Sequence, residues 1–312
     1  MNVAIRLIAL LALTPPVGAQ ELAFANIDQA KQILATRDAF VERLSPFDRA
    51  ARLKTNRVVT EAEYLEFAAS AALGWEEADR RAISAAYDQV EAKIRALHLP
   101  LPQKIFVVKT TGEEEGGAEY TRQGAIMIPR AKVGGNLPRV FAHELFHIAS
   151  RANPALAERL YAVIGFTRCT EASYPANLAS RRITNPDAPR NDYCIRVTLD
   201  GRSVAATPIL FSRAESYDPA RGREFFDYLQ LGLLIRAASG EALAAEKVVG
   251  LQQVTGFFEQ VGQNTQYVVH PEEILADNFA LLVLDMNAKS PAVLTSLRRV
   301  LAEFSSAPTG SR

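Results

Sequence analysis

Residues 134–151 read GGNLPRVFAHELFHIASR, and this stretch decides how the rest of the chain is interpreted. The two glycines interrupt the preceding segment, and Asn136 is a residue type that favours the N-cap position of a helix. Pro138 falls in the first turn, where its missing N–H does no harm, and Pro154 ends the pattern. The stretch therefore predicts a helix over residues 137–151.

The predicted helix carries the motif H-E-x-x-H, formed by His143, Glu144 and His147. Histidines four residues apart are separated by just over one helical turn, so both imidazoles project from one face and can bind one metal ion. Glu144 lies further around the helix, where it can take a proton from a water on that ion. The chain has only 4 histidines in 312 residues, so chance is a poor explanation for the motif.

A catalytic zinc needs a third protein ligand and one open position. Ser150 and Asn153 stand where a metzincin sequence would have glycine and a third histidine, so that type of site is excluded. His98 ends an amphipathic helix, where contact with the last carbonyls is the ordinary role of a histidine. Glu273 is the better candidate, because Glu273 and Asp277 place two carboxylates on one helical face.

These two carboxylates suit different roles at a metal. Glutamate can complete a His₂Glu zinc site, and aspartate one turn later can accept a hydrogen bond from the distal nitrogen of a ligating histidine. Carboxylates four residues apart often form only a solvated face, but the apolar Phe279–Leu284 that follows favours burial. His270 is expected either to cap the helix that starts at Pro271 or to donate a hydrogen bond to the reacting carbonyl oxygen. Three tyrosines are alternative donors: Tyr193, Tyr217 and Tyr267.

The combination of His143-Glu144-x-x-His147 with Glu273-x-x-x-Asp277 resembles the gluzincin group of zinc metallopeptidases, with its thermolysin-like arrangement. The resemblance covers two helices only. It implies a zincin-like domain and one zinc ion per chain, bound by His143, His147 and Glu273. It also implies that Glu144 is the general base and that Asp277 is hydrogen-bonded to His143.

The same resemblance implies a substrate-binding edge strand ahead of the motif helix, for which we expect Ala125–Ile128. This chain departs from the thermolysin pattern in the much longer stretch between His147 and Glu273. An insertion of that size would roof the cleft or narrow the specificity. We place the insertion at about residues 166–235.

Composition excludes several function classes. The chain has 35 basic and 35 acidic residues, so no overall field attracts a polyanion and no nucleic-acid partner is expected. The apolar content of 48% is sufficient for a large core. No apolar run reaches the ~18 residues needed to cross a bilayer, so no integral membrane span is expected in the mature chain.

The first nineteen residues are typical of a secretory signal peptide. Arg6 supplies the positive charge, Leu7–Leu13 the short apolar stretch and Val17-Gly18-Ala19 the small residues before a cleavage site. The alternative is an N-terminal helix packed on the body of the protein, which Pro15-Pro16 would interrupt. We therefore expect an exported protein, either periplasmic or secreted.

Cys169 and Cys194 agree with export. They bracket a polar, proline-containing loop, and an even pair of cysteines in an oxidising compartment usually forms a disulfide. Metal binding by these cysteines is the alternative, but no C-x-x-C spacing supports it.

The remaining patterns predict an α+β fold. The chain reads as helical from Ile27 to Leu97, then as two short strands at Ile105–Val108 and Ala125–Ile128. Between these strands, Glu113-Glu114-Glu115 is expected to be a solvated turn. Asp200-Gly201 predicts a hairpin between residues 195–199 and 203–211.

Two segments near the end are read as helices, residues 271–284 and 291–304. Residues 225–235 fit either a strand or a buried helix. The expected organisation is a signal peptide (1–19), a helical N-terminal region (20–99), a zincin-like domain (100–305) and a flexible tail (306–312). The zincin-like domain is expected to contain a small sheet, an active-site helix and a C-terminal helical part, and the disulfide-containing insertion lies within it.

The expected function is hydrolysis of peptide bonds in a peptide or protein substrate, through a metal-activated water and Glu144 as general base. The alternative is a non-catalytic exported protein, with a structural metal site or a helical scaffold that binds a partner. A structural zinc would be closed by a fourth protein ligand, whereas three good candidates are visible, which favours catalysis. Internal cleavage and cleavage at a chain end both remain open.

Overall fold

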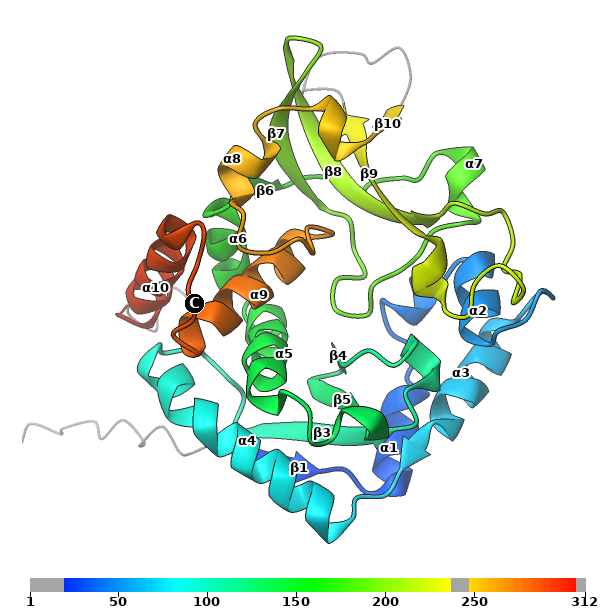
Figure 1. Cartoon of the computed structure of the whole chain (residues 1–312), viewed down its shortest axis with the longest axis vertical. Coiled ribbons are helices and arrows are strands. Elements are labelled where there is room, and N and C mark those ends of the chain that lie inside the picture. The colour runs from blue at the N-terminus through cyan, green and yellow to red at the C-terminus, as the bar shows by residue number, and fades with distance from the viewer. Residues whose placement is uncertain (1–19, 237–246, 307–312) are drawn as a thin grey trace, which may run out of the picture.

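The computed structural model describes residues 20–236 and 247–306, and it has a mixed fold of helices and two sheets (Figure 1). The two sheets lie at opposite ends of the molecule in this view, and helices α5 (Leu137–Ala152) and α9 (Pro271–Val283) lie between those ends. The α+β class expected from the sequence is confirmed.

The first sheet consists, in the described part of the chain, of β1 (Glu21–Phe24), β2 (Ala72–Leu73), β3 (Lys104–Thr110), β4 (Tyr120–Arg122) and β5 (Ala125–Pro129). Four of these strands follow the order β1-β3-β5-β4, and β2 pairs with β3. Strands β1 and β5 run parallel to β3, whereas β4 runs antiparallel to β5 at the edge of the sheet. Every residue of β5 is buried, as expected for a strand with neighbours on both sides.

This topology overturns one expectation. Ala125–Ile128 lies in β5, between β3 and β4, so the prediction that it forms the edge strand is wrong. The edge strand ahead of the motif helix is β4 instead. The physical reason is visible in the sequence, because an unbroken apolar run is typical of a central strand that is covered on both faces.

The second sheet is antiparallel throughout, in the order β10-β9-β8-β7-β6. Its strands in the described chain are β6 (Phe166–Arg168), β7 (Tyr193–Leu199), β8 (Arg202–Ser212), β9 (Leu229–Arg236) and β10 (Lys247–Val249). The expected hairpin around Asp200-Gly201 is confirmed, with both residues at positive φ. The undecided segment 225–235 forms a 3₁₀ turn at Phe225–Tyr228 followed by β9.

The other helices of the described chain are α1 (Ile27–Leu34), α2 (Pro46–Arg52), α3 (Glu61–Ser70), α4 (Glu77–Ala96), α6 (Pro154–Ala162), α7 (Ala176–Ala179), α8 (Phe257–Val261) and α10 (Pro291–Ser306). Helix α5 packs in an apolar core between α4 and α9. Phe141 meets Tyr87 of α4 with ring centroids 5.6 Å apart, and Phe146 meets Phe279 of α9 at 5.7 Å. Asn136 lies at the N-cap of α5, but its side chain makes no capping hydrogen bond.

The N-terminal region is joined to the following region by strands and by buried charge. Strand β1 pairs with β3, and β2 pairs with β3 on its other end. Arg52 of α2 is fully buried and donates hydrogen bonds to Asp48 and, through two nitrogens, to Glu115. Buried charges persist when they are paired in this way, because an unpaired one would be strongly destabilising.

The expected solvated turn at Glu113-Glu114-Glu115 is therefore wrong for two of its three residues. Glu114 and Glu115 are 0% and 2% exposed. The partner that makes burial of Glu115 tolerable is Arg52, which is remote in the sequence, so the local composition gave no sign of it.

The expected disulfide between Cys169 and Cys194 is confirmed, with the two Cα atoms 6.0 Å apart. It closes a loop that contains α7 and the following connection to β7. Among the described residues, no helix combines the length and the apolar character that a bilayer crossing requires. The expected signal peptide and residues 307–312 of the expected tail lie outside the described residues.

Candidate metal centre

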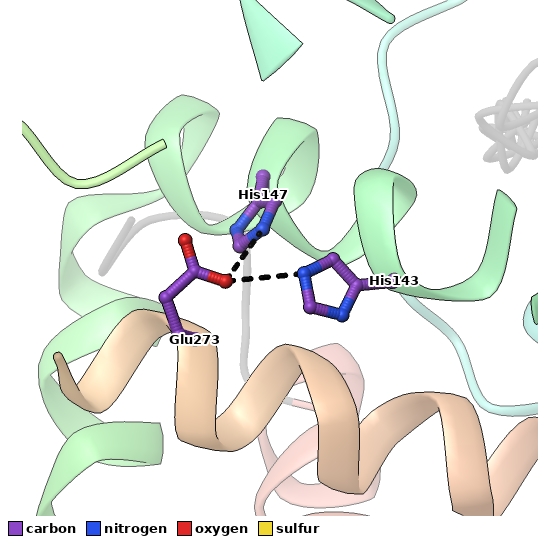
Figure 2. A group of neighbouring side chains, drawn as sticks. All are labelled: His143, His147 and Glu273. Atoms are coloured by element: carbon purple, nitrogen blue, oxygen red, sulfur yellow. Dashed lines mark hydrogen bonds and ion pairs between the residues drawn. The ribbon is translucent and has the colours of Figure 1, made fainter. Parts of the chain in front are cut away.

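Two remote helices bring three predicted ligands together. Helix α5 supplies His143 and His147, and the first turn of α9 supplies Glu273 (Figure 2). Oε2 of Glu273 lies 3.1 Å from Nε2 of His143 and 3.7 Å from Nε2 of His147. A tetrahedral ion with bonds of about 2.0–2.1 Å requires ligand atoms roughly 3.3 Å apart, so these distances fit one cation.

His147 provides an independent test of that fit. Its side chain is fully buried, and Nδ1 lies 2.7 Å from Oε1 of Glu272. Nε2 has no hydrogen-bond partner among the described residues. When Nδ1 donates its proton to the carboxylate, Nε2 carries a lone pair directed at the ligand cluster, which is the state that binds a metal.

Glu272 was missed by the sequence analysis. Its carboxylate accepts hydrogen bonds from Ser150 and Tyr161 in addition to the contact with His147. Burial would raise the pKa of Glu272, but the hydrogen bond and charge of His147, together with the hydrogen bonds from Ser150 and Tyr161, lower it overall. Side chains of neighbouring helical residues point about 100° apart. Glu272 can therefore contact Nδ1 of His147 while Glu273 lies on the side of its Nε2.

The second predicted carboxylate is where the resemblance implies it. Oδ1 of Asp277 lies 3.3 Å from Nδ1 of His143, and Arg139 and Thr265 hold Asp277 in place. Such outer contacts orient a ligating imidazole and set its tautomer.

Asn185 is a further residue that the sequence analysis missed. Its Nδ2 donates a hydrogen bond of 2.6 Å to Oε1 of Glu273. This contact leaves Oε2 directed toward the histidines. Burial would raise the pKa of Glu273, but the charge of His147, the hydrogen bond and charge of His143 and the hydrogen bond from Asn185 together lower it, so the carboxylate is ionised.

Glu144 lies beside the ligands and faces the edge strand. Its Oε2 accepts a 2.7 Å hydrogen bond from Oγ1 of Thr121 in β4, and its side chain is buried. Burial raises the pKa of Glu144 to about 7, although His143 and Thr121 oppose the shift. A cation in the ligand cluster would favour the ionised form, which is the form that accepts a proton.

A second buried acidic residue, Asp187, lies close to Glu144 and His147. Glu144, His147 and Asp187 each offer one ligand atom, and these atoms lie within 4.8 Å of one another. Oδ1 of Asp187 accepts a 2.7 Å hydrogen bond from the backbone N–H of Thr121. Burial raises the pKa of Asp187 to about 8, against the effect of His147.

Asn185, Pro186 and Asp187 form one segment, which we call the NPD turn. It belongs to the connection between α7 and β7, a loop that lies between the second sheet and β4 in Figure 1. Asparagine, proline and aspartate are common loop residues, so the composition of this stretch indicates an ordinary loop and gives no sign of a role at the site.

A cavity of about 240 Å³ opens onto the ligands. His143 and Glu273 form one part of its wall, and the NPD turn forms another. Tyr267 is the member of the three candidate tyrosines that lines this cavity. Tyr193 packs against Tyr161 with ring centroids 4.6 Å apart, and Tyr217 packs in a separate core cluster.

The remaining histidines lie away from the cavity. His270 is the N-cap of α9, where its Nδ1 accepts a 3.1 Å hydrogen bond from the backbone N–H of Glu272. It lines two other hollows, and neither of them is lined by His143 or Glu273. His98 is exposed just after the end of α4.

Two imidazoles and one carboxylate form a donor set suited to a divalent transition metal such as zinc. His143, His147 and Glu273 thus form a group of described residues that could bind one such ion. Two observations agree with this: Nε2 of His147 has no hydrogen-bond partner, and it lies 3.7 Å from Oε2 of Glu273. Comparisons with protein-family models, with curated protein sequences and with solved structures give no match for this chain.

Proposed function

We propose that this chain is an exported zinc-dependent peptidase of the gluzincin type. The proposal rests on one observation: ligand atoms of His143, His147 and Glu273 lie within 4.8 Å of one another, and Nε2 of His147 has no hydrogen-bond partner among the described residues. Glu144 lies beside this group. The Cys169–Cys194 disulfide supports export, because such bonds persist in oxidising compartments.

His143, His147 and Glu273 would hold the zinc, which would supply a Lewis acid for the scissile carbonyl and make the attacking water more acidic. In this proposal Glu144 accepts the proton of the attacking water; the Thr121 hydroxyl fixes its Oε2, and one of its carboxylate oxygens lies within 4.8 Å of a ring nitrogen of His147. Glu144 then delivers that proton to the leaving amine. Tyr267 in the cavity wall can donate a hydrogen bond to the carbonyl oxygen as negative charge develops there.

The first test is removal and return of the metal. We expect purified protein to contain about one zinc per chain and a mixed peptide library to be cleaved. A chelator should abolish cleavage, and added zinc should restore it. Zinc at ~1,000 times its Kd should also raise the melting temperature by about 10 °C, because it binds only the folded state. Cleavage that survives complete removal of the metal would contradict the proposal.

One observation favours the alternative of a structural metal. Asp187 is a carboxylate near His147, and as a fourth ligand it would close the site. Against this, Oδ1 of Asp187 is already bonded to the backbone of Thr121.

Asp187→Asn separates the two functions, because asparagine keeps an oxygen for the Thr121 N–H but loses the charge. For a catalytic site with three ligands we expect zinc affinity to change less than about tenfold, below the range reported for outer contacts of ligands. The measurement is competition for zinc with a chromophoric chelator. A loss of several hundredfold, together with no hydrolysis by the unmodified protein, would favour the structural metal.

A further inference from the structure

The outward edge of strand β4 is already occupied within the molecule. Thr121 is the middle residue of β4; its N–H donates to Oδ1 of Asp187, and its carbonyl oxygen accepts a 2.7 Å hydrogen bond from Arg151. A second nitrogen of Arg151 donates to the carbonyl oxygen of Pro186 at 2.9 Å. A peptide that extends a sheet pairs with such backbone groups, so a substrate cannot pair with Thr121 while the NPD turn holds this position.

The NPD turn is held at its start as well as at this end. The backbone N–H and hydroxyl of Thr184 donate to Asp48, and Arg52 donates to the Thr184 carbonyl oxygen. Asn185 donates to Glu273. Because these contacts tie the turn to α2 and α9, we expect a substrate to be recognised by other means than pairing with the edge strand.

The acidic side chains of the cavity wall supply no free charge for recognition. Besides Glu273, which faces the histidines, three acidic residues line the cavity. Each of them pairs with a basic side chain: Glu115 with Arg52, Glu119 with Lys132 and Asp187 with Arg151. The attraction of a paired charge for a further ion is largely cancelled by its partner. Recognition therefore depends on the uncharged side chains of the wall.

One side of the cavity is apolar, and the stretch expected to be an insertion supplies it. Five large apolar side chains from residues 166–235 line the cavity: Ile183, Leu210, Phe225, Phe226 and Leu229. Three of them, Ile183, Leu210 and Phe225, belong to one buried cluster that includes residues of α2. Because this cluster joins the insertion to the rest of the molecule, the apolar wall is preformed, as is usual for a ligand pocket.

Phe225 and Phe226 form an aromatic pair in this wall. Their ring centroids lie 4.1 Å apart, and the guanidinium carbon of Arg52 lies 4.4 Å from the ring centroid of Phe225. Phe226 is 41% exposed, and Tyr267, which lines the same cavity, is 39% exposed. Large aromatic side chains that stay exposed beside a cavity are typical of a binding site.

The size of the cavity fits a large side chain. Its volume is about 240 Å³. A cavity of about 150 Å³ lined by leucine, isoleucine and phenylalanine binds benzene, so this one has room for the ring of a phenylalanine or the branched chain of a leucine. His143 and Glu273 line the same cavity, so a side chain bound there belongs to a residue close to the candidate metal ligands.

We propose that the enzyme selects peptides by a large apolar side chain next to the scissile bond, bound against Leu210, Phe226 and Leu229, and not by pairing of the peptide backbone with β4. This inference rests on the proposed peptidase function and specifies its substrate class. The favourable contribution is burial of the side chain, which grows with the apolar area removed from water. The insertion then narrows the specificity, because all three pocket residues belong to it.

Two chelating probes that differ in one side chain test the pocket without turnover. They are the hydroxamates of N-acetylphenylalanine and N-acetylalanine, neither of which has a charged amine. We expect zinc-loaded protein to bind the phenylalanine probe at least about tenfold more tightly in calorimetry, because burial of a side chain of that size is worth roughly that factor or more. Phe226→Ala should lower this ratio at least about threefold, because one apolar face of the pocket is lost.

Phe258→Ala is the matched control. Phe258 is 42% exposed, lies on α8 and does not line the cavity, so its loss should leave the ratio unchanged. Circular dichroism checks that both variants are folded. Equal binding of the two probes, or an unchanged ratio in Phe226→Ala, would overturn the inference while zinc binding and peptide cleavage stand.

Modified peptides provide the second readout. We expect alanine in place of the large apolar residue beside the cleaved bond to lower kcat/KM at least about tenfold, and the fragments show on which side of the bond that residue lies. N-methylation of amides outside the scissile bond should change kcat/KM less than about threefold, because it removes donors that only an edge strand would use. A larger loss would assign recognition to the backbone and overturn the inference.

Failure of the proposed function has a different signature. If the protein binds zinc but cleaves no peptide, the peptidase function fails, and the hydroxamate ratio still decides whether the pocket takes a large apolar side chain. Protein that binds no zinc would overturn both proposals.

Discussion

Glu144→Gln is expected to retain about one zinc per chain and to lower kcat roughly 10³-fold, within the range that general acid–base groups contribute. Glutamine has the size of glutamate and can still meet the Thr121 hydroxyl, so the fold and the ligands should be unchanged. It cannot accept a proton from water, however, and this is the step that the position of Glu144 supports. The measurements are zinc content and steady-state turnover of a cleaved peptide.

A matched control is Glu158→Gln on the neighbouring helix α6, where the carboxylate pairs with Arg168 at the surface. This variant removes the same charge and should leave both zinc content and turnover unaltered. Normal turnover in Glu144→Gln would remove the proposed base. Loss of zinc from Glu144→Gln would assign this residue to metal binding instead.

Glu273→Gln should have the largest effect on the metal. The change removes the only carboxylate in the proposed ligand set and leaves two neutral imidazoles, so zinc affinity should fall by more than the ~10–100-fold that outer contacts typically cost. Glu272→Gln and Asp277→Asn serve as comparisons, because each removes an orienting partner of one histidine. Their affinities should fall within that 10–100-fold range.

Competition with a chelator of known affinity measures all three variants, and circular dichroism checks that each is folded. Wild-type affinity in Glu273→Gln would show that the ligand set is wrong. The cluster of Glu144, His147 and Asp187 would then be the remaining group of described residues that could hold the ion.

The local features of the site could be predicted from sequence because they depend on short-range geometry. Histidines at positions 143 and 147 face the same way in any helix, and so do the carboxylates at 273 and 277. The disulfide and the hairpin at Asp200-Gly201 likewise follow from residue types and local spacing.

Features that depend on remote partners could not be predicted in this way. Glu115 looks like a surface residue until Arg52 is placed beside it, and β5 becomes central only once β4 pairs with it. Asn185 and Asp187 have the composition of an ordinary loop, and their roles follow from contacts with Glu273 and Thr121.

The sequence by itself therefore determined that two histidines and a glutamate between them share a helix suited to a metal, and that a second helix offers paired carboxylates. Only the tertiary structure decided that Glu273 meets those histidines, that Glu272 orients His147, and that the NPD turn closes one side of the cleft. The physical reason is that helical periodicity acts over a few residues, whereas these contacts depend on which surfaces pack together across more than a hundred residues of chain.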